Sequence, residues 1–118
     1  MRIIGERSPD DCVDTGFIKV YLLNEKVTED FLKFLQNFGE LQILDGIREP
    51  FYTVDKEYFF TLKGLVGKME MKVVYRKDRM DEAKGFIETL MRCYSMKDGG
   101  RGLEEAKAAE RKIKEKIL

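Results

Sequence analysis

The chain has 118 residues, a length typical of one domain with a single hydrophobic core. Its 22 basic and 22 acidic side chains cancel, which argues against a protein held to nucleic acid or to a membrane by bulk charge alone. Hydrophobic residues make up 43% of the sequence, so a disordered protein is excluded for residues 17–96. No apolar stretch approaches the length of a membrane span, the N-terminus does not resemble a signal peptide, and we expect a cytoplasmic protein.

The first half of the chain predicts a strand, a helix and short strands. Residues 17–23 are β-branched and aromatic, and their alternation would place Ile18, Val20 and Leu22 on one face of a strand. Thr28 has the side chain and position of an N-cap, and Gly39 is expected to end the helix that follows. Two short strands are expected next, at residues 41–44 and 51–54.

The second half predicts a hairpin followed by a helix. Residues 57–63 and 68–76 alternate between apolar and polar positions, and a turn bounded by Gly64 and Gly67 joins them. Asp78 is expected to cap a helix that runs to about Tyr94. Gly85 inside this helix suggests close packing against the sheet, because glycine otherwise costs helix stability.

These elements predict an α+β fold. We expect a two-layer sandwich with a mainly antiparallel sheet of four to five strands, two helices on one face and an extra C-terminal helix. The chain is expected to form a single domain overall. Residues 1–98 make the α+β domain with an N-terminal extension at 1–16, residues 99–102 a glycine-rich linker, and residues 103–118 an amphipathic helix.

The residue types present exclude much of the common enzyme chemistry. The chain contains no His, so it lacks the commonest general base and the commonest metal ligand. Cys12 and Cys93 are too few for a zinc site. The carboxylates Asp10, Asp11 and Asp14 lack the spacing of a calcium loop. We therefore expect no metal, no cofactor and a protein that is not an enzyme.

The outer face of the predicted sheet is the candidate binding surface. If the alternating apolar residues of the strands face the helices, the opposite face combines aromatic and basic side chains: Phe17, Lys19, Tyr21, Phe59, Lys63, Lys68, Lys72 and Arg76. Aromatic residues among lysines are typical of sheets that bind single-stranded nucleic acid. Burial under the C-terminal helix or under a second subunit is the other interpretation, and we favour it.

The C-terminal helix is the candidate self-association element. A narrow apolar stripe runs along it, formed by Leu103, Ala106, Ala109, Ile113 and Ile117. An isolated helix of this length is marginally stable in water, so the stripe needs a partner. The expected partner is either the outer sheet face of the same chain or a second copy, which would make a homodimer.

In composition the chain resembles small uncharacterised archaeal α+β proteins. Its element order is also similar to one half of the saddle of TATA-box-binding protein, over residues 17–96, with a short matching stretch at Ile47-Arg-Glu-Pro50. That resemblance implies a strand, a helix, several antiparallel strands and a second helix. The family's intercalating phenylalanines are not identifiable in this sequence, so it implies no DNA-binding function.

The leading hypothesis from the sequence is a non-catalytic binding or interaction module that associates with itself. The alternative is a nucleic-acid-binding module that uses the outer sheet face. An enzyme or small-ligand binder with carboxylate chemistry is the third hypothesis, since carboxylates remain the available acid–base groups.

Overall fold

One antiparallel sheet carries helices on one of its two faces. The computed structural model describes residues 1–7, 17–45, 49–56, 59–76, 78–95 and 101–117. The strands are β1 (Ile3–Arg7), β2 (Ile18–Leu23), β3 (Glu40–Leu44), β4 (Phe51–Lys56), β5 (Phe60–Leu65) and β6 (Glu70–Tyr75). The helices are α1 (Glu29–Leu35), α2 (Met80–Tyr94) and α3 (Arg101–Ile117). The α+β class expected from the sequence is confirmed.

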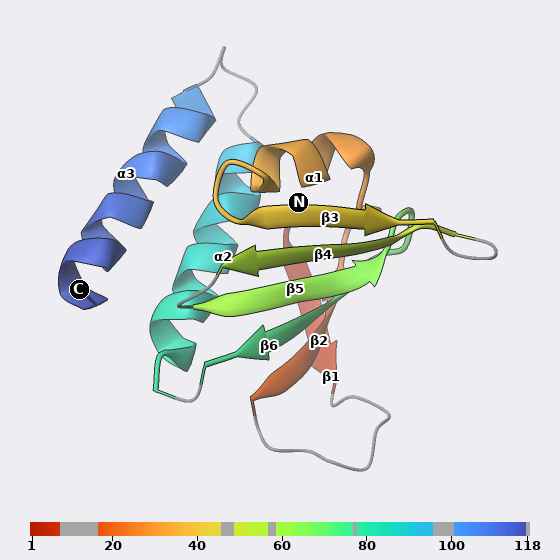
Figure 1. Cartoon of the computed structure of the whole chain (residues 1–118), viewed down its shortest axis with the longest axis horizontal. Helices are drawn as coiled ribbons and strands as arrows, with labels where there is room; N and C mark the ends of the chain where they lie inside the picture. Colours follow the sequence, from red (N-terminus) through yellow and green to blue (C-terminus); the bar gives the residue numbers. More distant parts are fainter. Residues whose placement is uncertain (8–16, 46–48, 57–58, 77, 96–100, 118) are drawn as a thin grey trace.

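The sheet has six strands in the order β1-β2-β6-β5-β4-β3, rather than the four to five expected. Every neighbouring pair is antiparallel. The additional strand is β1, which lies in what the sequence indicated was an N-terminal extension. In Figure 1, α2 passes behind the sheet, α1 is seen above β3, and α3 packs beside α2. Within the described residues, no helix covers the opposite, outer face of the sheet.

The central strands bury the residues that their alternation indicated. Met71, Val73 and Tyr75 of β6 are buried, as are Phe60 and Leu62 of β5. Directly opposite residues of an antiparallel pair share a face, so these side chains form one apolar layer under the helices. Met69 continues the same alternation in the sequence, but it precedes β6 and is exposed.

The prediction of which face of β2 is buried was wrong, because the other alternating set of residues points toward the helices. Tyr21 pairs with Met71 and therefore points toward the helices, whereas Leu22 pairs with Glu70 on the outer face and is exposed. Both faces of this strand are apolar, so the alternation alone does not decide which face is buried. Val20 is buried even though it pairs with Lys72 on the outer face.

Helix α1 begins where the sequence indicated. The backbone N–H of Phe31 donates to the hydroxyl of Thr28 at 3.2 Å, which satisfies one of the free donors of the first turn. Val27 and Leu32, on either side of the cap, are both fully buried. The helix ends at Leu35, and Gly39 lies beyond the turn that follows rather than ending the helix itself.

The boundaries of the other two helices differ from those expected. Helix α2 begins after Arg79 without a side-chain cap, so Asp78 is not its N-cap. Gly85 of α2 is exposed with open space around it, so it does not mark close packing against the sheet. Helix α3 starts at Arg101, so the end of the expected linker forms its first turn. The rest of the linker lies outside the described residues.

Helix α3 is held against the rest of its own chain. Ala106 is fully buried, and Leu103, Ala109 and Ile113 pack against the core. The Lys56 ammonium, at the end of β4, lies 2.5 Å from a carboxylate oxygen of Glu110 and donates to the backbone oxygen of Phe38 at 2.8 Å. The expected stripe is therefore used within the chain and does not cover the outer sheet face. The side chain of Ile117 lies outside the description.

A pair of glycine substitutions tests the packing. A Cβ on Gly64 would lie 2.7 Å from the hydroxyl oxygen of Tyr52, a buried side chain on the neighbouring strand. We expect Gly64→Ala to lower the free energy of unfolding by about 1–3 kcal/mol. Gly85→Ala is the matched control, and we expect it to raise stability by about 0.5–1 kcal/mol because it meets open space in a helix. Denaturant unfolding measures both, and equal effects of the same sign would contradict this packing.

A double-mutant cycle tests the attachment of α3. Lys56 and Glu110 are both largely buried, so replacing each and both by Ala should reveal a coupling of about 1 kcal/mol or more. Arg92 and Glu105 also join α2 to α3, at 3.1 Å, but both side chains are exposed. The same cycle on that pair should give less than about 0.5 kcal/mol. Equal couplings would show that the buried pair does not anchor the helix.

Candidate interaction surface

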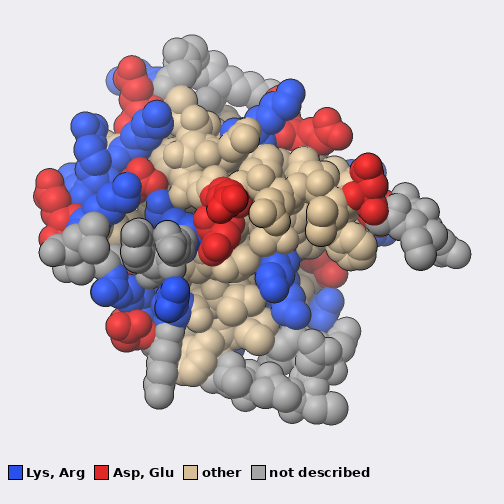
Figure 2. Space-filling model, in the orientation of Figure 1, with Lys and Arg blue, Asp and Glu red and all other residues tan. Residues whose placement is uncertain are grey.

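The outer face of the sheet is less basic than the sequence suggested. Lys63 and Lys72 lie opposite each other at its centre, but Glu70 pairs with Arg7 at 3.2 Å, and Asp55 and Glu40 occupy neighbouring positions. Figure 2 shows this face, on which uncharged residues form a broad area over the ends of β3, β4 and β5, while basic side chains gather over α3. The face is mixed in charge and partly apolar.

The structure does not bring together the eight residues of the predicted binding surface. Tyr21 and Phe59 are 1% and 2% exposed and belong to the core. Phe17 also packs against the core. Lys19 pairs with Val73, which places it on the helix face of the sheet. Placing these four residues on the outer face was therefore wrong.

The remaining four predicted residues are basic and lie on or beside the outer face. Lys63 and Lys72 are on it, while Lys68 and Arg76 flank β6 and are exposed. The Lys68 ammonium lies 3.4 Å from a carboxylate oxygen of Glu49. A nucleic-acid surface needs aromatic rings beside such charges, but of its three proposed rings Tyr21 and Phe59 are buried and Phe17 packs against the core. Phe59 instead stacks on Phe86 of α2, with ring centroids 6.1 Å apart.

A shallow hollow of about 290 Å³ opens on the outer face beside β3. Glu40, Asp55 and Lys63 line it with Gln42, and the Thr61 hydroxyl donates to Asp55 at 3.1 Å. The described residues contain no group of three or more His, Cys, Asp or Glu side chains that could hold a metal ion. The hollow therefore offers polar contacts but no metal centre within that part of the chain.

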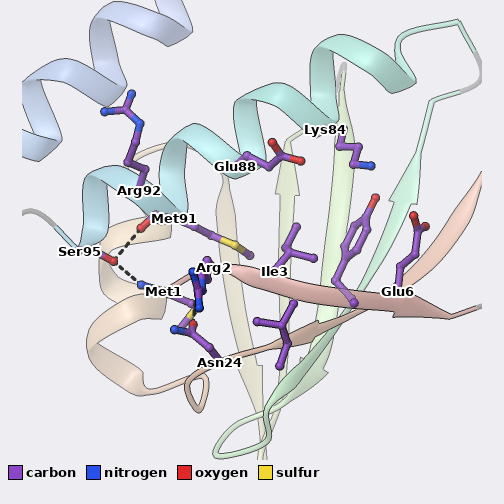
Figure 3. A pocket seen from close by; sticks show the side chains of 13 residues that line it. Met1, Arg2, Ile3, Glu6, Asn24, Lys84, Glu88, Met91, Arg92 and Ser95 are labelled. Atoms are coloured by element: carbon purple, nitrogen blue, oxygen red, sulfur yellow. Dashed lines mark hydrogen bonds between the residues drawn. The ribbon is translucent and has the colours of Figure 1, made fainter.

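A larger cleft, of about 680 Å³, lies between β1 and α2 (Figure 3). Glu6, Lys84, Glu88 and Arg92 line it, so acidic and basic groups alternate around its rim. At one end, the amino group of Met1 donates to the hydroxyl of Ser95, which donates to the backbone oxygen of Met91. With Arg2 and the Met1 amino group, the lining has four positive groups and two carboxylates, but no ligand class follows from this surplus alone.

Tyr21 also lines the cleft, and its hydroxyl group is hydrogen-bonded to the hydroxyl group of Tyr75. The hydroxyl oxygens of Tyr21 and Tyr75 lie 2.5 Å apart. Burial raises the pKa of both phenols, and the nearby Glu6 and Glu88 carboxylates raise it further. Burial likewise raises the pKa of the Cys93 thiol. None of these three groups is prepared to act as a base or nucleophile at neutral pH.

The exposed edge formed by β3 is the feature that sequence reasoning missed. β3 ends the strand order and keeps an unbroken register with β4 from Glu40 to Leu44. Ile43 and Leu44 are 44% and 64% exposed, and Phe51, opposite Leu44 on β4, is 52% exposed. We call Leu41, Gln42, Ile43, Leu44 and Phe51 the β3 edge surface. Its signal in the sequence is a short strand without Lys or Pro whose apolar residues occupy both alternating positions.

The other edge of the sheet is built differently. The pairing of β1 with β2 shifts register between Ile3 and Gly5. The last two residues of β1, Glu6 and Arg7, are charged and exposed, and Arg7 forms an ion pair with Glu70 of β6. Irregular pairing and charge are common ways to prevent an edge strand from recruiting another strand. β3 has no register shift, and its one charged residue, Glu40, stands at the start of the strand.

The buried tyrosines predict a loss of stability in alkaline solution. Burial raises the pKa of Tyr52 and Tyr75 above their usual value in the folded state. A raised pKa in the folded state means that folding favours the neutral phenol. The contribution of each buried phenol to the free energy of unfolding is therefore complete below about pH 10 and is lost as the pH rises further. We expect the urea midpoint to fall above that pH, and to fall less steeply in Tyr52→Phe. An identical pH dependence in the variant would contradict this assignment.

Comparison with known proteins adds no relative. No protein-family model matches the chain, no curated protein matches it, and no solved structure matches it. None of the described helices is long and apolar enough to cross a membrane. A functional assignment therefore depends on the geometry of the surfaces described above.

Proposed function

We propose that the chain is a non-catalytic interaction module that takes up an extended protein segment as an additional strand along β3. One observation carries this proposal: β3 is a regular edge strand with exposed apolar side chains on both faces of the sheet. An edge of this kind presents backbone N–H and C=O groups in the spacing that another strand needs.

The side chains of the β3 edge surface suit such a partner on both faces. Leu41 and Ile43 pair with the buried residues Val54 and Tyr52, so they lie on the helix side of the sheet. Leu44 lies on the outer face beside Phe51, and Gln42 lies on the same face. A strand with apolar residues at alternating positions would extend the core on one side and cover Leu44 and Phe51 on the other.

The nucleic-acid alternative has weaker support. It relied on Phe17, Tyr21 and Phe59 as stacking groups; Tyr21 and Phe59 are buried, and Phe17 packs against the core. The basic residues that remain on or beside the outer face lie among Asp55, Glu40 and Glu70, and the net charge of the chain is zero. Charge balance of this kind gives little of the phosphate attraction on which non-specific binding depends.

A peptide-binding experiment tests the proposed function. A short fluorescent peptide of alternating Thr and Val supplies a generic strand, and a Gly-Ser peptide of equal length is the control. We expect the first peptide to bind the full chain and the second not to bind. Leu44→Lys should weaken binding at least about tenfold, because it places a charge in the edge.

Ile4→Lys is the matched control variant. Ile4 is 59% exposed on the opposite edge strand, so the substitution adds the same charge at a similarly exposed site away from β3. This variant should bind the Thr-Val peptide as well as the unmodified chain does. The proposal is wrong if neither peptide binds over a range of protein concentrations, or if Ile4→Lys and Leu44→Lys weaken binding equally.

A further inference from the structure

We infer that the strand taken up by β3 is the β3 strand of a second copy of this chain, paired antiparallel about Gln42. This inference rests on the proposed function and names its partner. The partner is identified by the self-complementarity of the five residues of β3, Glu40 to Leu44.

The register follows from the length of the strand. A two-fold axis at Gln42 sets Gln42 opposite its own copy, Leu41 opposite Ile43, and Glu40 opposite Leu44, so all five residues are paired. Moving the axis to Leu41 or Ile43 leaves two residues of each strand without a partner inside β3. Slipping the pairing by one residue would place the helices of the two copies on opposite faces of the joined sheet.

The same register brings apolar side chains of the two copies together on the helix side of the sheet. Leu41 and Ile43 lie on the helix side, as shown by their pairing with Val54 and Tyr52. Across the two-fold axis Leu41 of each copy contacts Ile43 of the other. These contacts would extend the apolar layer from one copy into the next. Ile43 is 44% exposed in the single chain, so this contact would remove apolar surface from water.

Charge does not oppose this pairing. Glu40 is the only charged residue of β3. In the Gln42 register the two copies of Glu40 are four positions apart along the strands, about 14 Å at the usual rise per residue. That distance exceeds the Debye length of roughly 8 Å in physiological salt, so their repulsion is screened. Each Glu40 instead lies opposite Leu44 of the other copy.

The two unlike edges of the sheet explain why assembly would stop at two copies. Pairing β3 of one copy with β1 of the next would repeat without limit and produce a fibre. The register shift at Ile3 and Gly5 and the charged residues Glu6 and Arg7 disfavour that contact. Pairing β3 with β3 joins two six-stranded sheets and leaves only the two β1 edges outside. Because five residue pairs form a small contact, we expect the dimer to dissociate on dilution.

Sedimentation of the full chain and site-specific cross-linking test this inference. We expect a concentration-dependent dimer, whose dissociation constant rises at least about tenfold in Gln42→Lys, because two ammonium groups would then lie opposite each other. Cross-linking uses a background in which Cys12→Ser and Cys93→Ala remove the native thiols. Directly opposite residues have Cα atoms about 4.5–5.5 Å apart, within the range that a disulfide spans.

The pattern of disulfides reports the register. Gln42→Cys alone should form a covalent dimer under mild oxidation, whereas Glu40→Cys alone should not. A mixture of Glu40→Cys and Leu44→Cys chains should form one, because these two positions lie opposite each other. Circular dichroism of each variant establishes that it is folded before cross-linking.

Three results would overturn the inference. A monomer at high concentration without Gln42→Cys cross-links, in a chain that still binds the Thr-Val peptide, rejects the second copy as partner but leaves the proposed function standing. A monomer that also fails to bind the peptide rejects both. A dimer that cross-links through Glu40→Cys alone, or species that grow beyond two copies, rejects the two-fold pairing about Gln42.

Discussion

The pairing of Tyr21 with Met71 determines which face of the sheet the chain buries. Opposite residues of an antiparallel pair share a face, so once these two side chains point toward the helices, Val73, Leu62 and Val54 follow across the neighbouring strands. Helix α2 then finds a continuous apolar layer for Phe86, Ile87 and Leu90. The residues left on the other face make a mixed surface, on which apolar residues such as Ile18, Leu22 and Val74 lie among charged ones.

The attachment of α3 limits which surfaces remain for partners. Lys56 joins β4 to Glu110 of α3, and its ammonium also lies 5.5 Å from the centre of the Phe86 ring. The apolar residues Leu103, Ala106 and Ile113 of α3 are already packed in their own chain, so they could contact a second copy only if the helix first detached. An exposed strand edge such as β3 needs no such rearrangement to pair with another strand.

Local patterns in the sequence predicted individual strands and helices well, but they did not predict which faces of those elements pack against neighbours. The alternation in β6 and the cap at Thr28 were sufficient, because the side chains concerned act within one strand or one turn. The faces of β2 were not predictable, since Tyr21 and Leu23 compete with Val20 and Leu22 for burial and the decision is made by β6. Strand β1 gives little signal because a short edge strand with Gly5 and two charged residues depends on its neighbour for order.

For the candidate surface, too, the local pattern predicted single side chains but not the position of a strand in the sheet. Lys63 and Lys72 were expected on the outer face and lie there, because β5 and β6 alternate clearly. The edge position of β3 depends on the order of strands in space, in which β2 inserts beside β6 and leaves β3 last. No short stretch of sequence carries that order.

The close approach of Gly64 to Tyr52 also constrains how this sequence can diverge. Within the described part of the chain the Tyr52 hydroxyl has no hydrogen-bond partner, so exchange to Phe loses no bond found there, but a Cβ on Gly64 would still lie 2.9 Å from the ring carbon Cζ. A side chain at position 64 therefore meets the ring of Tyr52 as well as its hydroxyl. A larger residue at position 64 is tolerated best together with a smaller side chain at position 52, so the two positions are expected to covary. Lineages that retain Tyr52 should retain Gly64 with it.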